Sequence, residues 1–335
     1  MRLLLSLALL VFITASWVER PKAHTGAADP AAAAMAFMQA LPLADQQRAG
    51  LAFDDPQRTA FRWTPGRRAG VPLSSLTPEA REELSHLLNL VLSQQGAVTV
   101  DAILATEAAL GVIEGRPSYR DPERYYTAIF GRPGSERWGL RFEGHHLSIN
   151  LTFEGTRAIS GTPLFLGANP ETIGDGPDAG LRAMARQVDR AWDLYDSLSV
   201  EQQTKARQVR SGFQGFLTRP GSLRAPATRD AGAGLAWQDL TPPQRDALIA
   251  VAVSYIEILG DRLSVPAIAV LVEEEAPYLR FHWSGADNRG GAYYYRINGR
   301  RLFIEHNAQN GGTHIHAIWR DAAGDWGGGG EIPAE

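Results

Sequence analysis

The chain has 335 residues, a formal net charge of −4 and no cysteine. This length suits two modest domains or one large one, and 44% hydrophobic with 21% charged residues is an ordinary globular composition. The lack of cysteine excludes disulfides, thiolate nucleophiles and thiolate metal sites, and the lack of a basic run argues against nucleic acid as a partner.

The N-terminus has the pattern of a signal peptide. Arg2 precedes an apolar run over residues 3–13, and small residues follow it. We therefore predict a signal peptide over residues 1–16 and an exported protein, periplasmic or secreted, with no stable membrane span after cleavage. The alternative is an uncleaved anchor, but the run is shorter than the about 20 residues that a membrane span needs.

Residues 17–50 form an N-terminal extension, and the first clear helix follows at residues 75–93. Thr77 before Pro78 is typical of a helix start, and leucines then recur at helical spacing. The same start signal returns at residues 240–243. Between these helices, residues 219–234 are rich in Gly, Ala and Pro and are predicted to be a linker.

Two later segments resemble each other. Residues 138–150 align without gaps on residues 293–305, and each is predicted to be a β-hairpin. Asn298-Gly299 is a favoured two-residue turn, and Glu143-Gly144 occupies the matching place. Such turns would pair Arg141 with His146. The repeated order of helix and hairpin favours a tandem duplication, with chance similarity as the alternative.

We therefore predict an α+β protein of two diverged tandem units, residues 51–218 and 235–335. Each unit would pack a helix on a small antiparallel sheet that contains a β-hairpin. The two-residue period of a strand divides each hairpin into an apolar face and a polar face. The polar faces carry Arg141, His146, Ser148, Asn150 and Thr152 in the first unit, and Arg296, Arg301, Phe303, Glu305 and Asn307 in the second.

The histidines suggest a metal site. His314 and His316 lie two apart on a predicted strand, so their imidazoles point the same way and can share an ion. His146, His306 or Glu305 could supply a third ligand, and imidazole suits zinc or copper(II). The alternative is a pair of partly buried, hydrogen-bonded strand histidines without a metal.

Other polar residues near the hairpins are candidates for catalysis and ligand binding. An arginine fork matches a carboxylate or phosphate, although cross-strand salt bridges are an alternative role for these arginines. The candidate acid/base residues are Glu143, His146 and Glu305; the candidate ligand-binding residues are Arg141, Asn150, Arg296 and Arg320; and the candidate metal ligands are His314, His316 and His306.

Several motifs resemble a family of exported bacterial proteins known only as domain-of-unknown-function family 3500. They lie at residues 53–56, 76–78, 120–126, 142–148, 162–170 and 314–321, in family order. One departure is the segment 61–65, where the family leads us to expect differently spaced aromatics. The resemblance implies kinship and export and no particular activity, and it directs attention to residues 143–150 and 314–321.

Three functions remain open at this stage. The first is a metal-dependent extracytoplasmic enzyme, hydrolytic in type, with the histidine-rich hairpins as its site. The second is a non-catalytic protein that binds a small anionic or saccharide-like molecule. The third is an envelope structural protein whose histidines only pack. The sequence leaves the substrate and the oligomeric state open.

Overall fold

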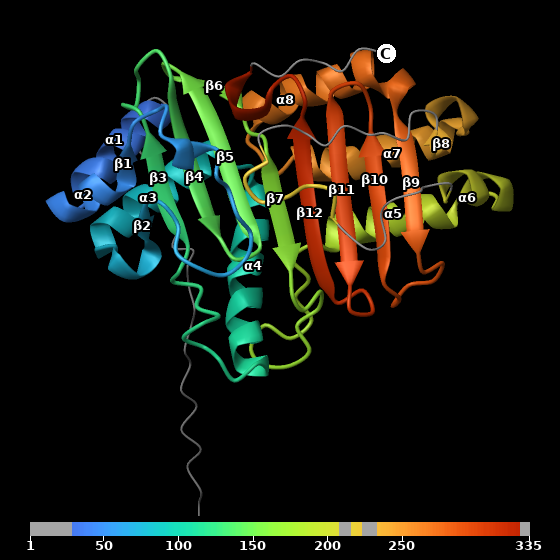
Figure 1. Ribbon diagram of the computed structural model, residues 1–335, viewed down its shortest axis with the longest axis horizontal. Coiled ribbons are helices and arrows are strands. Elements are labelled where there is room, and N and C mark those ends of the chain that lie inside the picture. Colours follow the sequence, from blue (N-terminus) through green and yellow to red (C-terminus); the bar gives the residue numbers. More distant parts are fainter. Residues whose placement is uncertain (1–28, 208–215, 223–232, 329–335) are drawn as a thin grey trace, which may run out of the picture.

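The computed structural model describes residues 29–207, 216–222 and 233–328. These residues form one mostly antiparallel twelve-stranded sheet in the order β1-β3-β4-β5-β7-β12-β11-β10-β9-β8, with β2 added on β3 and β6 on β5 (Figure 1). The strands are β1 (Gly50–Leu51), β2 (Val71–Pro72), β3 (Tyr126–Phe130), β4 (Trp138–Gly144), β5 (Leu147–Glu154), β6 (Arg157–Ser160), β7 (Leu164–Ala168), β8 (Leu235–Ala236), β9 (Arg280–Gly285), β10 (Tyr293–Asn298), β11 (Leu302–Gln309) and β12 (His314–Asp321).

Two helices begin where the sequence signals predict. The Thr77 side chain accepts the N–H of Ala80 at 3.2 Å, and Thr241 forms a reciprocal capping box with Gln244. These caps start the third and the seventh helix. The helices are α1 (Pro30–Ala40), α2 (Leu43–Ala49), α3 (Pro78–Val91), α4 (Gln94–Ile113), α5 (Ala185–Asp196), α6 (Val200–Ala206), α7 (Pro242–Ile256) and α8 (Asp261–Val270).

The α+β class is confirmed, but the two expected small sheets are joined into one. β7 pairs with β12 antiparallel, from Ile315 opposite Ala168 to Trp319 opposite Leu164. This pairing satisfies the backbone groups of what would otherwise be two open sheet edges. The predicted signal peptide lies outside the described residues, as does much of the predicted linker.

The two hairpins turn two residues later than we predicted. Gly144 pairs with Leu147, so the first turn is His145-His146 rather than Glu143-Gly144, and Arg141 pairs with Asn150. The Gly299 N–H bonds Leu302 O at 2.9 Å, which shifts the second turn in the same way. The prediction rested on local turn propensity alone. In the structure the His146 N–H bonds the carbonyl of Trp63, far away in sequence, and His146 takes the turn conformation with φ of +62°. Because the shift is even, the predicted division of faces is correct.

The two faces of the sheet are covered differently. The apolar face, which includes Leu140, Phe142, Ile149 and Ile304, belongs to one large core with the helices. The helix α4 is the one described segment that is long and apolar enough to cross a membrane, and half of its most apolar window is buried inside the protein. Core helices of soluble proteins commonly have these properties, so we draw no membrane topology from α4.

The opposite face of the sheet is covered by irregular chain. Residues 58–70 form a first strap and residues 216–222 a second, and together with the sheet they enclose a smaller core. The two straps meet where the Gly221 N–H bonds the Phe61 carbonyl at 2.9 Å. The members of this second core are Phe61, Trp63, Phe165, Phe303, Ile318 and Trp326.

Candidate metal centre

Three histidines from two strand ends converge on this strap-covered face. His146 comes from the β4–β5 turn, and His314 and His316 come from the start of β12. One ring nitrogen from each lies within 4.8 Å of the others. The Nε2 atoms of His146 and His314 are 3.0 Å apart. Nitrogens that bind one tetrahedral zinc at about 2.05 Å stand about 3.3 Å apart, so the cluster has the dimensions of a three-histidine metal site.

Burial keeps these imidazoles neutral. Burial, together with the neighbouring histidines, lowers the pKa of His314 to about 4 and that of His316 to about 3. The pKa of His146 is well below its usual value for the same reasons. A neutral imidazole offers a nitrogen lone pair, so the three rings are in the state that binds a metal.

The surroundings of the cluster leave one side open. His146 is only 2% exposed, while His314 and His316 are half-buried and reach toward solvent. Trp63 stacks on Phe165 with ring centroids 4.6 Å apart, and both rings border His316. The cluster thus has an aromatic wall on one side and access for water on another.

Gly167 makes room for the buried ring. It pairs with His316 across the β7–β12 ladder, on the same face as the histidines. A Cβ at this position would come 3.1 Å from His146 Cδ2 and 2.6 Å from the carbonyl oxygen of Ile315. The absence of a side chain at Gly167 therefore lets the His146 ring approach β7 this closely.

A carboxylate–imidazole pair lies behind the cluster. Glu107, in the middle of α4, is 3% exposed and bonds His145 Nδ1 at 2.5 Å. The His145 ring stacks on His146 with centroids 3.7 Å apart. A buried carboxylate needs such a partner, because leaving it unpaired would cost several kcal/mol. The pair fixes the ring against which His146 rests.

Glu107, His145 and His146 also have the spacing of a metal site, with ligand atoms within 4.8 Å of one another. However, Arg120 Nη1 lies 3.3 Å from both ring nitrogens of His145 and is a fixed positive charge. Arg120 is in turn held by two bonds to Glu114. Because a guanidinium repels a cation at this distance, the cluster His146, His314 and His316 is the better metal site.

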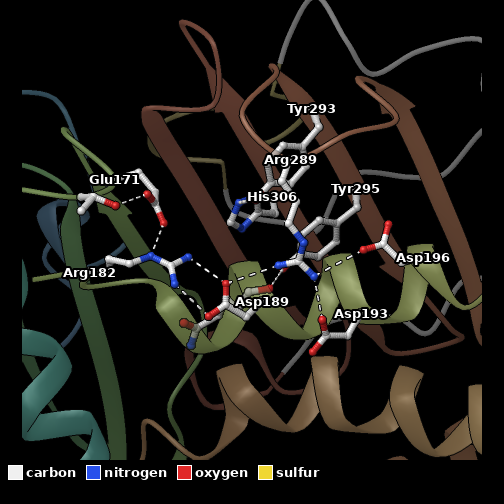
Figure 2. A network of polar contacts seen from close by, with 11 residues as sticks. Glu171, Arg182, Asp189, Asp193, Asp196, Arg289, Tyr293, Tyr295 and His306 are labelled. Atoms are coloured by element: carbon white, nitrogen blue, oxygen red, sulfur yellow. Dashed lines mark hydrogen bonds and ion pairs between the residues drawn. The ribbon is translucent and has the colours of Figure 1, made fainter. Parts of the chain in front are cut away.

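His306 lies away from the cluster. It is on the helix-covered face, where its ring stacks on Tyr295 and its nitrogens contact the hydroxyls of Tyr255 and Tyr293 at 3.0 and 3.3 Å. Figure 2 shows it beside Tyr293 and Tyr295, near a network of ion pairs around Asp189. His306 pairs with Ala317 of β12, the residue next to His316, and successive residues of a strand point to opposite faces. The structure therefore does not bring His306 together with His314 and His316.

The two candidate acid/base glutamates form hydrogen bonds and ion pairs with the straps. Glu143 is 1% exposed; it accepts the Arg62 N–H at 2.9 Å and pairs with Arg68 at 2.9 Å. Glu305 is fully buried and accepts backbone N–H groups of the second strap. Burial raises the pKa of Glu305 to about 7, although these bonds pull it down. Both carboxylates fasten straps to the sheet.

The four candidate ligand-binding residues also make internal contacts. Each is at most 4% exposed. Arg320 bonds Asp325 at 2.6 Å, and the Asn150 amide donates to Pro163 O at 2.8 Å. Arg141 bonds the carbonyl of Arg58, and Arg296 bonds the Asn298 side chain. These contacts hold the straps, the hairpins and the C-terminal segment together.

Glu107 and the role of His145 were not predicted from the sequence. A glutamate in the middle of a long apolar helix was the available signal, since such a residue is rarely buried without a partner. The signal for His145 was weaker, because only the later turn places its ring, 9% exposed, against α4.

A family model described as "protein of unknown function (DUF3500)" matches residues 24–328. The chain belongs to this family. DUF3500 thus covers both straps, both hairpins and all three clustered histidines, and it assigns no activity to them. No curated protein and no solved structure matches the chain.

Proposed function

We propose that this DUF3500 protein is an exported, metal-dependent enzyme whose metal is held by His146, His314 and His316. The observation that carries the proposal is that three neutral imidazoles converge and that solvent has access to one side of their cluster. Three protein ligands with one open position are typical of catalytic rather than structural zinc sites. Zinc and copper(II) both suit such a ligand set.

The chemistry that best fits this arrangement is hydrolysis. A zinc ion held by His146, His314 and His316 would supply an activated water nucleophile near neutral pH. The chain itself supplies the orientation: Gly167 admits the His146 ring, and the Glu107–His145 pair holds it from behind. Trp63 and Phe165 border the open side, where an apolar part of a substrate would lie. Export is proposed from the N-terminal pattern of residues 1–16.

Cobalt substitution tests the open position. The purified chain, without an affinity tag, would be loaded with Co(II), and its visible spectrum recorded before and after adding azide. We expect about one tightly bound equivalent and a spectral shift with azide, because azide can occupy the open position. The same preparation loaded with zinc would be screened against ester, phosphoester and glycoside model substrates. A Co(II) spectrum unmoved by azide would contradict a catalytic site.

A structural role is the second candidate. Its support is that Glu143, Glu305 and the buried arginines all fasten the straps, so most of the buried polar groups on this face serve the fold. On this account a metal would join β12 to the β4–β5 turn. It would raise the thermal midpoint strongly without supporting any turnover.

We also propose that the chain arose by tandem duplication. The elements β2, α3, β3, β4 and β5 have counterparts in the same order in β8, α7, β9, β10 and β11. The two helix ends meet reciprocally, since the Ser93 N–H bonds Ile258 O and the Gly260 N–H bonds Val91 O. The turn that holds His145-His146 in the first unit holds Arg300-Arg301 in the second, so the metal site would be present in one unit only.

A further inference from the structure

A buried amide flanks the three-histidine cluster on the β11 side. Asn307 is 1% exposed and lies directly opposite His316 in the antiparallel pairing of β11 with β12. Directly opposite residues project from the same face of a sheet, with their Cβ atoms about 4.5–5.5 Å apart. Asn307 therefore shares the strap-covered face with His316, and Figure 1 shows β11 and β12 side by side.

The amide nitrogen of Asn307 has no hydrogen-bond partner in the part of the chain that the structure describes. A buried N–H that has lost its water costs free energy unless an acceptor replaces that water. Nearly all buried polar groups in proteins are therefore paired, and each exception needs a specific cause. An acceptor that arrives with a bound ligand is such a cause.

Two polar neighbours of Asn307 on this face are already engaged. Tyr294 lies opposite Asn307 on β10, and its hydroxyl donates to Glu305 Oε1 at 3.1 Å. Glu305, two residues before Asn307 on β11, also accepts backbone N–H groups of the second strap. On its other side Asn307 faces β12, where His314 and His316 offer ligand atoms to a metal.

The β11 flank of the cluster reaches solvent at the end of the strand. Gln309 lies opposite His314 on the same face as Asn307, and it is exposed. A ligand that enters beside Gln309 passes His314 before it reaches the Asn307 amide. On the β7 side the His146 ring lies against Gly167, so the two flanks of the cluster differ.

We propose that Asn307 binds the ligand that occupies the open position of the metal. Its amide donates a hydrogen bond to an acceptor atom of that ligand, such as the carbonyl oxygen of an ester or an oxygen of a phosphoester. This inference rests on the metal-dependent function proposed above. It adds a residue that contacts the ligand and not the metal.

The test is azide titration of the full chain loaded with Co(II), followed by visible spectroscopy, in wild type, Asn307→Leu and Asn307→Ala. Both variants should bind Co(II) within about threefold of the wild-type affinity, because the three histidines are unchanged. Their azide affinity should fall at least about tenfold, the effect of losing one hydrogen bond to a charged group. Leucine adds volume and alanine removes it, so a loss in both variants results from the missing amide.

Thr127→Val is the matched control. Thr127 is fully buried on β3, and its hydroxyl also lacks a partner among the described residues. It lies opposite Phe142, on the helix-covered face of the sheet. The change removes an unpaired buried polar group and keeps the shape of the side chain, so it should alter azide affinity less than about twofold. Circular dichroism checks that each variant is folded.

The possible failures are distinguishable. A wild type that does not bind Co(II), or whose Co(II) spectrum azide does not change, would overturn the metal centre and this inference together. If the wild type binds azide, unchanged azide affinity in Asn307→Ala would overturn the role of Asn307 alone, whether or not Asn307→Leu loses affinity through its bulk. A loss of Co(II) affinity as large as the loss of azide affinity would also overturn it, because Asn307 would then support the metal site itself.

Discussion

Replacing Glu107 with glutamine tests the pair that lies behind the metal site. The glutamine has the shape of the native side chain and can still accept the His145 N–H through its amide oxygen, but it carries no charge. Because the Glu107 and His146 ligand atoms are within 4.8 Å, a metal on the far side of His146 would be about 7 Å from the carboxylate.

This distance bounds the expected loss. A unit negative charge about 7 Å from a divalent ion would contribute at most about 5 kcal/mol at an effective dielectric constant of about 20. Arg120, beside His145, offsets part of this charge. We therefore use the 10–100-fold loss of metal affinity, about 1.4–2.7 kcal/mol, that is typical when outer-shell partners of a metal ligand are changed. We therefore expect Glu107→Gln to weaken zinc binding about 10–100-fold while the chain stays folded.

The assay is competition for zinc against a chromophoric chelator, with circular dichroism as a check on folding. Glu114→Gln is the matched control, since it removes an equal charge from a side chain that is 28% exposed and held by Arg120. We expect the control to change zinc affinity less than about threefold, because water screens it. Equal affinities for wild type and Glu107→Gln would refute the reasoning about this pair.

Three further predictions concern the surrounding residues. Gly167→Ala should lower zinc affinity, and it should lower the free energy of unfolding by about 1–3 kcal/mol, because its Cβ would lie 3.1 Å from the His146 ring and 2.6 Å from a backbone oxygen of β12. Gly174→Ala is the control, since its Cβ would have no atom within 4 Å. Equal effects in the two variants would contradict the close fit at Gly167. His306→Gln should leave zinc affinity within about twofold while lowering the thermal midpoint, and a large loss of affinity would show that His306 is a ligand after all. Glu305 has a folded-state pKa of about 7, above the unfolded value, so its contribution to stability is greatest below about pH 4.5 and is lost as the pH rises through 7. In denaturant unfolding, the free energy of unfolding of the wild type should therefore fall by up to about 3 kcal/mol relative to that of Glu305→Gln between pH 4.5 and 8. A difference between the two that does not change with pH would refute this.

Local patterns predicted two helix starts and the faces of the hairpin strands and of the strand that carries His314. Thr77-Pro78 and Thr241-Pro242 fix helix starts because capping depends on neighbours in sequence, and the alternation around His314 fixes which side chains share a face. Since His314 and His316 are two apart on one strand, their proximity followed from the sequence alone.

Long-range contacts were beyond the sequence. The turn at His145-His146 depends on the Trp63 carbonyl, and the single sheet depends on β7 meeting β12; neither contact has a local signal. The straps that occupy Glu143 and Glu305 are irregular chain without periodicity. For the same reason Glu107 was missed, because its partner His145 is 38 residues away.

The most direct test of the central claim is the metal content of the chain, measured by elemental analysis of protein purified without an affinity tag and after loading with zinc and desalting. We predict about one equivalent in wild type and in the control His86→Ala, and less than about a tenth in folded His146→Ala, His314→Ala and His316→Ala variants. A folded wild type without retained metal, or variants that retain a full equivalent, would contradict the assignment of these three histidines as a metal site.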